Sequence, residues 1–425
     1  MKTTPLWWDD AAPVPAPAPV PERCDVAVIG SGYCGLTAAR ALAAAGRRVV
    51  VLETGDPGFG ASSRNSGHVG GAPKLPLDLD QRFGAEGAAR LRREWKEATA
   101  FFHALIAGLD VDYVRSGRFV AAHTPAAYQG LLHKAEAYRR DFNMKVREVS
   151  RAEQRAELGT DAYHGGIVLQ DAGSLHPAKL HAALRKLAEA AGATLCGQAH
   201  VSHIERARDG WRLTTARGPL HAAELVAAVN GYAGPELPAI RRGVIPVTPF
   251  MIATEELPPE VIADILPTNM NGGDTKRLLY AFRRDPAGRR IIFTGRPGGN
   301  GLDERAAAPA LHRMLCGLWP ALAPYRVSHS WKGFIGFTFD YMPAMGERGG
   351  IHFAAGCQGA GVVVMTYLGH LIAQKLLGRL SQPSAFALAP FPLRPFHRGN
   401  PWFLPIVESV YRFLDRREWP GPGAD

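Results

Sequence analysis

The sequence predicts an α/β fold that combines a parallel sheet with a second, antiparallel sheet. Residues 26–53 have the pattern of a strand, a glycine turn, a helix and a second strand. Residues 351–377 carry a further strand, glycine turn and helix. Two other segments, 243–257 and 289–296, have the composition of antiparallel strands. The first two stretches therefore predict parallel strands joined by helices, and the last two predict the second sheet.

Size and composition restrict the class of protein. The chain has 425 residues, enough for two or three domains, of which 46% are hydrophobic and 21% charged. No stretch is long and apolar enough to span a bilayer, and the N-terminus lacks a secretory pattern. The net charge is +10, but the basic residues are dispersed and no recognition module for nucleic acid is visible. We therefore expect no nucleic-acid partner and no integral membrane segment.

The five cysteines are scattered and contain no Cys-x-x-Cys pair. An odd number at such spacings argues against a disulfide scaffold and against a structural zinc site. No metal-ligand spacing is present among the histidines. We therefore expect no metal ion, and a reducing cytoplasm as the location of the protein.

The turn after the first strand has the spacing of a dinucleotide-binding motif. Gly30, Gly32 and Gly35 form G-x-G-x-x-G. The first glycine allows the tight turn, the second lets the backbone approach a pyrophosphate, and the third lets the helix pack closely. Glu53 ends the second strand, where an acid accepts hydrogen bonds from ribose hydroxyls and repels the 2′-phosphate of NADP. Both NAD and FAD fit these residues.

The stretch after Glu53 separates the two cofactors. A plain NAD domain continues with another helix and strand, whereas "TGDPGFGASSRNSGHVGGAPK" is a long Gly/Ser/Asn loop suited to wrapping phosphates and a ring system. Its G-x-G-A-S-x-R-N-x-G pattern, residues 58–67, resembles the glycine/D-amino-acid oxidase family of FAD enzymes, most closely its gamma-glutamylputrescine-oxidoreductase-like branch. Residues 171–195, 200–234 and 331–378 resemble the same family.

The resemblance implies FAD as the cofactor and assigns the residues that bind it. In the family, the position of Val201 contacts adenine, and the turn at Asn230 and Gly231 closes near the cofactor. The helix that begins near Gly359–Val362 points at the flavin, where its dipole and free N–H groups stabilise the anionic reduced ring. The full cofactor-binding set is Gly30, Gly32, Gly35, Glu53, Ser62, Ser63, Arg64, Asn65, Gly67, His68, Val201, Asn230, Gly231, Gly359, Gly361 and Val362.

The resemblance also implies two interleaved domains. The Rossmann-like FAD-binding domain is expected at residues 22–75, 150–235 and 325–385, and the antiparallel-sheet substrate domain at 76–149 and 236–324. The Pro/Ala-rich leader is set at residues 1–21, and its Pro/Ala alternation from Ala11 to Pro21 is expected to lie extended outside the fold. The C-terminal tail, residues 386–425, is amphipathic, and we expect it to pack on its own domain or on a partner subunit rather than on a membrane surface.

On the substrate side, the chain departs from the family pattern. Amino-acid-oxidising members hold the substrate carboxylate with an arginine in the segment W-x-G-x-R-P-x-T-x-D, and Ile335 stands at the arginine position here. Isoleucine cannot replace a bidentate guanidinium clamp, which favours an amine over an α-amino acid. The apolar side chains around it match the methylene chain of an amine, and they would equally fit a protein core. The substrate-binding candidates are Phe334, Ile335 and Phe337, with Arg283 and Arg296 as an alternative clamp.

The expected reaction is oxidation of the C–N bond of a primary or secondary amine, of the polyamine or gamma-glutamylputrescine type, to an imine by hydride transfer to flavin. No second G-x-G-x-x-G is present, so electrons enter from the substrate and leave to oxygen or another acceptor. The alternatives are oxidation of glycine, sarcosine or a D-amino acid, and a flavin-binding protein without turnover. Catalytic residues stay unassigned, because His68, His176 and His352 are candidates by residue type alone.

FAD is expected to bind without a covalent bond. Some relatives tether it through a cysteine just before the T-x-D element, but residues 333–340 contain no cysteine. Others use a histidine in the loop after the ribose-binding acid, and His68 lies further from Glu53 than in those relatives.

Overall fold

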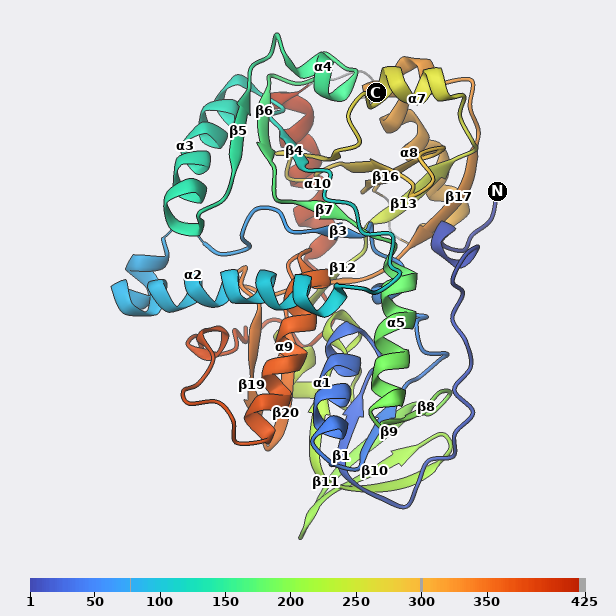
Figure 1. The fold of residues 1–425 in the computed structure, drawn as a ribbon, viewed down its shortest axis with the longest axis vertical. Helices are drawn as coiled ribbons and strands as arrows, with labels where there is room; N and C mark the ends of the chain where they lie inside the picture. The colour runs from blue at the N-terminus through green and yellow to red at the C-terminus, as the bar shows by residue number, and fades with distance from the viewer. Residues whose placement is uncertain (77, 299–300, 420–425) are drawn as a thin grey trace.

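The computed structural model describes residues 1–76, 78–298 and 301–419, and within them two eight-stranded sheets form the frame of the molecule (Figure 1). The first sheet has the order β19-β20-β11-β1-β2-β8, and β10 and β9 extend from β11. Its strands are β1 (Arg23–Ile29), β2 (Val49–Leu52), β8 (Thr194–Cys196), β9 (Val201–Ala207), β10 (Gly210–Thr215), β11 (Gly218–Ala227), β19 (Ala344–Arg348) and β20 (Ile351–Ala355). The five strands from β20 to β8 pair in parallel, which confirms the predicted parallel sheet.

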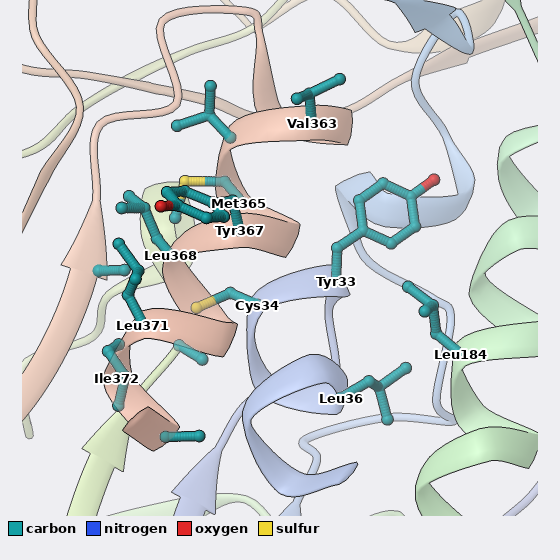
Figure 2. Close-up of a cluster of buried hydrophobic side chains, with 14 of the residues drawn as sticks. Tyr33, Cys34, Leu36, Leu184, Val363, Met365, Tyr367, Leu368, Leu371 and Ile372 are labelled. Atoms are coloured by element: carbon teal, nitrogen blue, oxygen red, sulfur yellow. The ribbon is translucent and has the colours of Figure 1, made fainter. Parts of the chain in front are cut away.

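Helices cover one face of this sheet. They shield the apolar side chains that its central strands present there. All four residues of β2 are buried, as are Val26 and Val28 of β1. The covering helices are α1 (Tyr33–Ala44), α5 (Pro177–Ala190) and α9 (Gly361–Leu376), and α2 (Leu79–Ile106) crosses over α9 (Figure 1). Figure 2 shows Leu36 of α1 and Leu184 of α5 in the core that these helices share with Leu368 of α9. The contact between α1 and α9 is close, since a Cβ at Gly369 would lie 2.2 Å from the carbonyl oxygen of Cys34.

The second sheet has the order β17-β13-β16-β15-β14-β4-β6-β5 and is antiparallel except for the pair β14 and β4. Its strands are β4 (Arg118–Ala121), β5 (Val146–Val149), β6 (Gly166–Leu169), β13 (Phe250–Thr254), β14 (Asn271–Asp274), β15 (Ala281–Arg284), β16 (Ile291–Gly295) and β17 (Val327–Lys332). Phe119, Phe282 and Phe293 pack on one face together with Leu311 of α8 (Glu304–Leu318). The remaining helices are α3 (Pro125–Phe142), α4 (Gln154–Leu158), α6 (Pro238–Arg241) and α7 (Pro259–Ile265).

Two small sheets are separate from the two eight-stranded sheets. One pairs β12 (Ile245–Val247) with β18 (Ile335–Phe337), and the other pairs β3 (His68–Val69) with β7 (Gly173–Ser174). The strands β6 and β17 belong to the second sheet, whereas the predicted boundaries group residues 166–169 and 327–332 with the FAD-binding domain. The cause is that a short apolar strand does not show in its own sequence which sheet it will join. The division of the chain into domains stays a prediction.

The prediction that the N-terminal leader lies outside the fold is wrong. The segment runs along α5 toward the β8 end of the first sheet (Figure 1). Trp7 is 1% exposed, and the backbone of Lys2 pairs with Ser328 at 2.8 Å and with Ser330 at 3.0 Å. Ala16 is also buried, and Pro17 forms a bridge with Cys196. The apolar residues at 6 and 7 anchor the segment by their burial, and the prolines that follow lower the entropy lost when it is ordered.

The C-terminal helix α10 (Leu404–Glu418) packs against its own chain. Asp415 is buried and accepts hydrogen bonds from the Arg277 guanidinium at 3.0 Å and from the backbone N–H of Leu278 at 2.9 Å. The outer side of the helix exposes Ile406, Val410 and Phe413. Residues 420–425 of the predicted tail lie outside the described residues. None of the helices in the described ranges is long and apolar enough to cross a membrane.

Candidate functional site

The glycine turn after β1 has room for a ligand only because side chains are missing from it. Gly30 adopts a φ of +98°, and a Cβ there would lie 2.9 Å from the carbonyl oxygen of Ala228. A Cβ at Gly35 would lie 2.0 Å from the carbonyl oxygen of Gly30, and one at Gly32 would lie 3.0 Å from the Ser62 hydroxyl. The three predicted glycines thus hold the turn tight and keep its backbone open, as pyrophosphate binding requires.

Two helix N-termini are open to an anion. The N-cap residues of α1 and α9, Gly32 and Ala360, supply no side-chain cap, and neither first turn contains an acidic residue. The Ser62 hydroxyl accepts a hydrogen bond from the Tyr33 N–H at 3.1 Å, so it lies at the N-terminus of α1 and pairs one of the N–H groups there. Gly359 precedes α9 with a φ of +81°. Unsatisfied N–H groups and the helix dipole at these points suit the phosphates and the reduced ring of FAD.

Glu53 lies at the end of β2, beside the glycine turn. Its carboxylate accepts hydrogen bonds from the N–H of Ser31 at 3.0 Å and from the Ser31 hydroxyl at 2.6 Å. Its carbonyl oxygen accepts from the N–H of Ala199 at 2.8 Å, two residues before Val201, which is buried at the start of β9. The ribose-binding and adenine-binding candidates therefore lie at the same end of the first sheet.

The loop that carries Ser63, Arg64 and Asn65 is held mainly by its own side chains. The Asn65 amide donates to the carbonyls of Ala61 and Ser62 and accepts from the N–H of Gly67. The Ser63 hydroxyl donates to the carbonyl of Gly58 and accepts from the Trp8 indole. The Arg64 guanidinium lies 4.5 Å from the ring of Trp8 and 4.5 Å from that of Phe59. These side chains shape the loop, which leaves its backbone groups for the cofactor.

Asn230 connects three segments at the carboxyl ends of β11 and β20. Its side-chain oxygen accepts from the N–H of Gly356 at 2.9 Å, and a Cβ at Gly336 would lie 2.1 Å from that oxygen. The residue adopts a φ of +44°, in the left-handed region. A Cβ at Gly231 would lie 3.3 Å from the Gly336 N–H. The turn therefore brings the predicted cofactor residues 230 and 231 next to β18, which carries Ile335.

The substrate-binding candidates have different neighbours in the structure. Ile335 is half-buried and packs against the core of the first sheet, and Phe337 lies beside Tyr341 with ring centroids 6.5 Å apart. Phe334 points to the ring of Tyr232, 5.0 Å away. The guanidinium of Arg296 lies 3.8 Å from the Glu408 carboxylate of α10, which competes with a role as substrate clamp.

Arg283 is buried, and its guanidinium donates hydrogen bonds to backbone carbonyls. It donates to the carbonyls of Ser66 at 3.1 Å, Leu175 at 2.8 Å and Arg284 at 2.9 Å. Burial lowers its pKa to about 10, so the group stays charged at neutral pH. Arg283 thus fastens the loop before His68 to the second sheet.

His68 lies on β3 between two arginines. Its Nδ1 lies 3.0 Å from the Arg118 guanidinium, which can only donate, so the proton of the neutral ring is on Nε2. Burial and the charges of Arg118 and Arg283 hold the pKa of His68 well below 6.5. The two other candidates by type have local partners: His176 caps α5 through the N–H of Lys179, and His352 lies near Glu347.

Among the described residues, one group has the geometry to hold a metal ion, formed by His123, Asp415 and Glu418. Both carboxylates are bound by Arg277, at 3.0 Å and 2.7 Å. These residues form an ion-pair network that holds α10 against the rest of the chain.

The fold and the open glycine turn define a dinucleotide-binding protein of the α/β class. The profile of the DAO family, described as FAD dependent oxidoreductase, matches residues 25–375, and the chain belongs to this family. FAD is therefore its cofactor, and the residues around the turn fit it.

Curated relatives agree with this assignment. The chain is 29% identical to the probable oxidoreductase OrdL of Rhizobium meliloti over 369 residues, 86% of this chain and 85% of the relative. It is 28% identical to gamma-glutamylputrescine oxidoreductase of Escherichia coli over 405 residues, 92% and 93% of the two chains. Among solved structures, glycine oxidase from Geobacillus kaustophilus superposes with a TM-score of 0.71 at 24% identity, over 88% of this chain and 99% of that one. The last comparison shows the shared fold.

Proposed function

We propose that this FAD-dependent oxidoreductase oxidises the C–N bond of a primary or secondary amine. The observation that carries the proposal is Ile335, an apolar residue of β18 at the position where amino-acid-oxidising relatives are expected to hold a carboxylate with arginine. β18 lies next to Asn230 and Gly231, which are among the proposed cofactor residues. The similarity to gamma-glutamylputrescine oxidoreductase supports an amine of that type.

Bound FAD supplies a two-electron acceptor: the carbon next to the amine nitrogen gives up a hydride, the nitrogen gives up a proton, and the resulting imine is hydrolysed by water. The protein's contribution is position and environment. The open N-terminus of α9 favours the negative charge of the reduced ring, and the neutral His68 adds no cationic group of its own.

We further propose that FAD is held without a covalent bond, that oxygen or another carrier reoxidises it, and that the protein works in the cytoplasm. All five cysteines are free thiols. Cys357 is buried with its sulfur 3.6 Å from the carbonyl oxygen of Gly336. The Nδ1 of His68, the other tether candidate, is engaged by Arg118, which leaves its Nε2 as the remaining ring nitrogen.

The test is anaerobic reduction of the purified yellow protein. We expect putrescine-type and gamma-glutamylated amines to bleach the flavin absorbance faster than glycine, sarcosine or D-alanine, and acid precipitation to leave free flavin in the supernatant. Faster bleaching by the amino acids would establish the alternative, an amino-acid oxidase or dehydrogenase with a relocated clamp. If no amine or amino acid reduces the flavin, the protein is a flavin carrier without turnover, and the proposal fails.

A further inference from the structure

One face of the second sheet presents charged side chains in a row across neighbouring strands. Arg118 of β4 is opposite Asn271 of β14. On the other side of β14, the register that pairs Gly272 with Phe282 brings Arg283 of β15 opposite the same Asn271. Side chains alternate between the faces of a strand. Phe119 and Phe282, the neighbours of these arginines along their strands, point into the apolar core under α8. Both arginines therefore lie on the opposite face.

The loop after β2 adds two basic side chains to this face. His68 contacts Arg118 at 3.0 Å, and the positive charges of Arg118 and Arg283 both act on it. Lys74 is reached by solvent, yet burial among the surrounding protein and the charge of Arg118 lower its pKa to about 8.

Among the described residues, only basic side chains act on Lys74 and His68, whereas the charges of Asp285 and Asp112 act on Arg283. The charges that act on Lys74 are those of Arg118 and Lys134, and those that act on His68 are the two arginines. Burial also lowers the pKa of Arg118 to about 10. Holding cations together in a partly desolvated place costs free energy, unless an anion joins them.

Polar atoms without partners lie on the same face. In the described part of the chain, Nε2 of His68, Oδ1 of Asn271 and Oγ1 of Thr294 are buried and have no hydrogen-bond partner. Asn271 is 1% exposed, and Thr294 of β16 is opposite Ala281, two residues before Arg283. Buried polar atoms are normally paired, so this face is built to contact a polar ligand. The Nε2–H of His68 is a donor that a carboxylate could accept from.

We propose that Arg118, Lys74 and His68 form a carboxylate-binding subsite, so that the substrate is an amine that also carries a carboxylate. The inference rests on the proposed amine oxidation. This subsite provides the positive charge that Ile335 does not, and its residues are far from residue 335 in the sequence. A plain diamine, which is doubly positive at neutral pH, gains no attraction from this group and should reduce the flavin more slowly than gamma-glutamylputrescine.

Binding of butyrate, a carboxylate that has no amine to oxidise, tests the subsite directly. We expect butyrate to bind the FAD-loaded protein in calorimetry and the uncharged butyramide to bind far less. Replacing Arg118 by Met should weaken butyrate binding about 10- to 100-fold, the usual range for a lost bond to a charged group, and Arg118→Lys should restore part of it. Arg151→Met, which removes an exposed arginine of the same chain, is the matched control and should leave butyrate binding unchanged. Flavin absorbance and circular dichroism report whether each variant is folded.

Three kinds of amine separate the possible positions of the carboxylate. Glycine and sarcosine carry it next to the reacting carbon, gamma-glutamylputrescine carries it far away, and putrescine has none. We expect the Arg118→Met variant to lose flavin reduction by carboxylate-bearing amines and to keep, or gain, reduction by putrescine. Equal butyrate binding by the folded Arg118→Met variant and the unchanged protein would overturn the subsite, even where amines reduce the flavin. Absence of reduction by every amine would instead refute the proposed function, and the butyrate result would still decide the subsite.

Discussion

The proposed cofactor half of the site, at the first sheet, is built mostly from backbone, whereas the proposed substrate half, at the second sheet, is built from side chains. The cofactor half consists of a glycine turn and two uncapped helix N-termini, and the side chains of its loop bind the loop itself. The substrate half consists of Arg118, Lys74 and His68, brought together from a strand and a loop. The difference teaches that a ligand common to a family can be held by local geometry, while the part that differs between relatives is left to exchangeable side chains.

The largest effect is expected for a substitution in the glycine turn, because the turn has no room for a side chain. The variant Gly35→Val places its side chain against the carbonyl of Gly30, since even a Cβ would lie 2.0 Å from that oxygen. We expect α1 to be displaced and FAD to be lost, with a flavin-to-protein absorbance ratio near zero. Gly130→Ala in α3, where a Cβ meets no atom within 4 Å, should keep its FAD and gain up to about 1 kcal/mol in the free energy of unfolding. Full FAD content in Gly35→Val would contradict the backbone account.

The N-terminal segment connects the two halves and gives the next largest effect. Trp7 donates to the carbonyl of Asn65 at 2.9 Å and packs near the Arg283 guanidinium, 5.5 Å from its ring. We expect Trp7→Ala to lower the free energy of unfolding by about 3–5 kcal/mol, the usual cost of removing a buried indole. Urea denaturation measures it. Trp402→Ala removes an indole that is 58% exposed and should change stability by less than about 0.5 kcal/mol. Equal urea midpoints for the two variants would show that the segment is only loosely attached.

The titration of Lys74 tests the proposed substrate half. Lys74, with a pKa of about 8, carries its charge below that pH and loses it above. Arg118 keeps its charge and His68 stays neutral over the same range, while Lys134 is the other basic residue that acts on Lys74. Butyrate affinity should therefore fall as pH rises through about 8, by about tenfold if one charged contact is lost. Lys74→Met should bind butyrate weakly at every pH and show a flat profile, and a persistent fall with the same midpoint would assign the titration to another group.

The smallest effect is expected outside both halves. Phe413 on α10 is 65% exposed, and its replacement by serine should change the free energy of unfolding by less than about 0.5 kcal/mol. Thermal unfolding of Phe413→Ser, compared with the unchanged protein at several protein concentrations, measures this. A large loss of stability that depends on concentration would show that another subunit covers this side of the helix.

Sequence reasoning predicted the fold class and the cofactor because the signals for both are local, while the residues assigned to bind FAD stay a prediction. The spacing of Gly30, Gly32 and Gly35 and the apolar strands beside them define a turn within a few residues, and the α/β class, the family and FAD are confirmed. The substrate half could not be predicted in the same way. Arg118 and Asn271 are far apart in the chain, and only strand pairing makes them neighbours. The sequence contained one unused signal for the N-terminal segment: two adjacent tryptophans, which are rarely left in solvent.

The docking of the N-terminus has a consequence for the order of folding. Lys2 pairs with residues 328 and 330, so the first part of the chain to be synthesised waits for one of the last. Closing a loop of that length in an unfolded chain costs roughly 5 kcal/mol in entropy, and the cost disappears once the intervening sheets have formed. The segment therefore attaches as the final step, after both sheets are complete. Until then, its tryptophans and the apolar surface that receives them are exposed together, and this is the stage at which a newly made chain depends most on protection from aggregation.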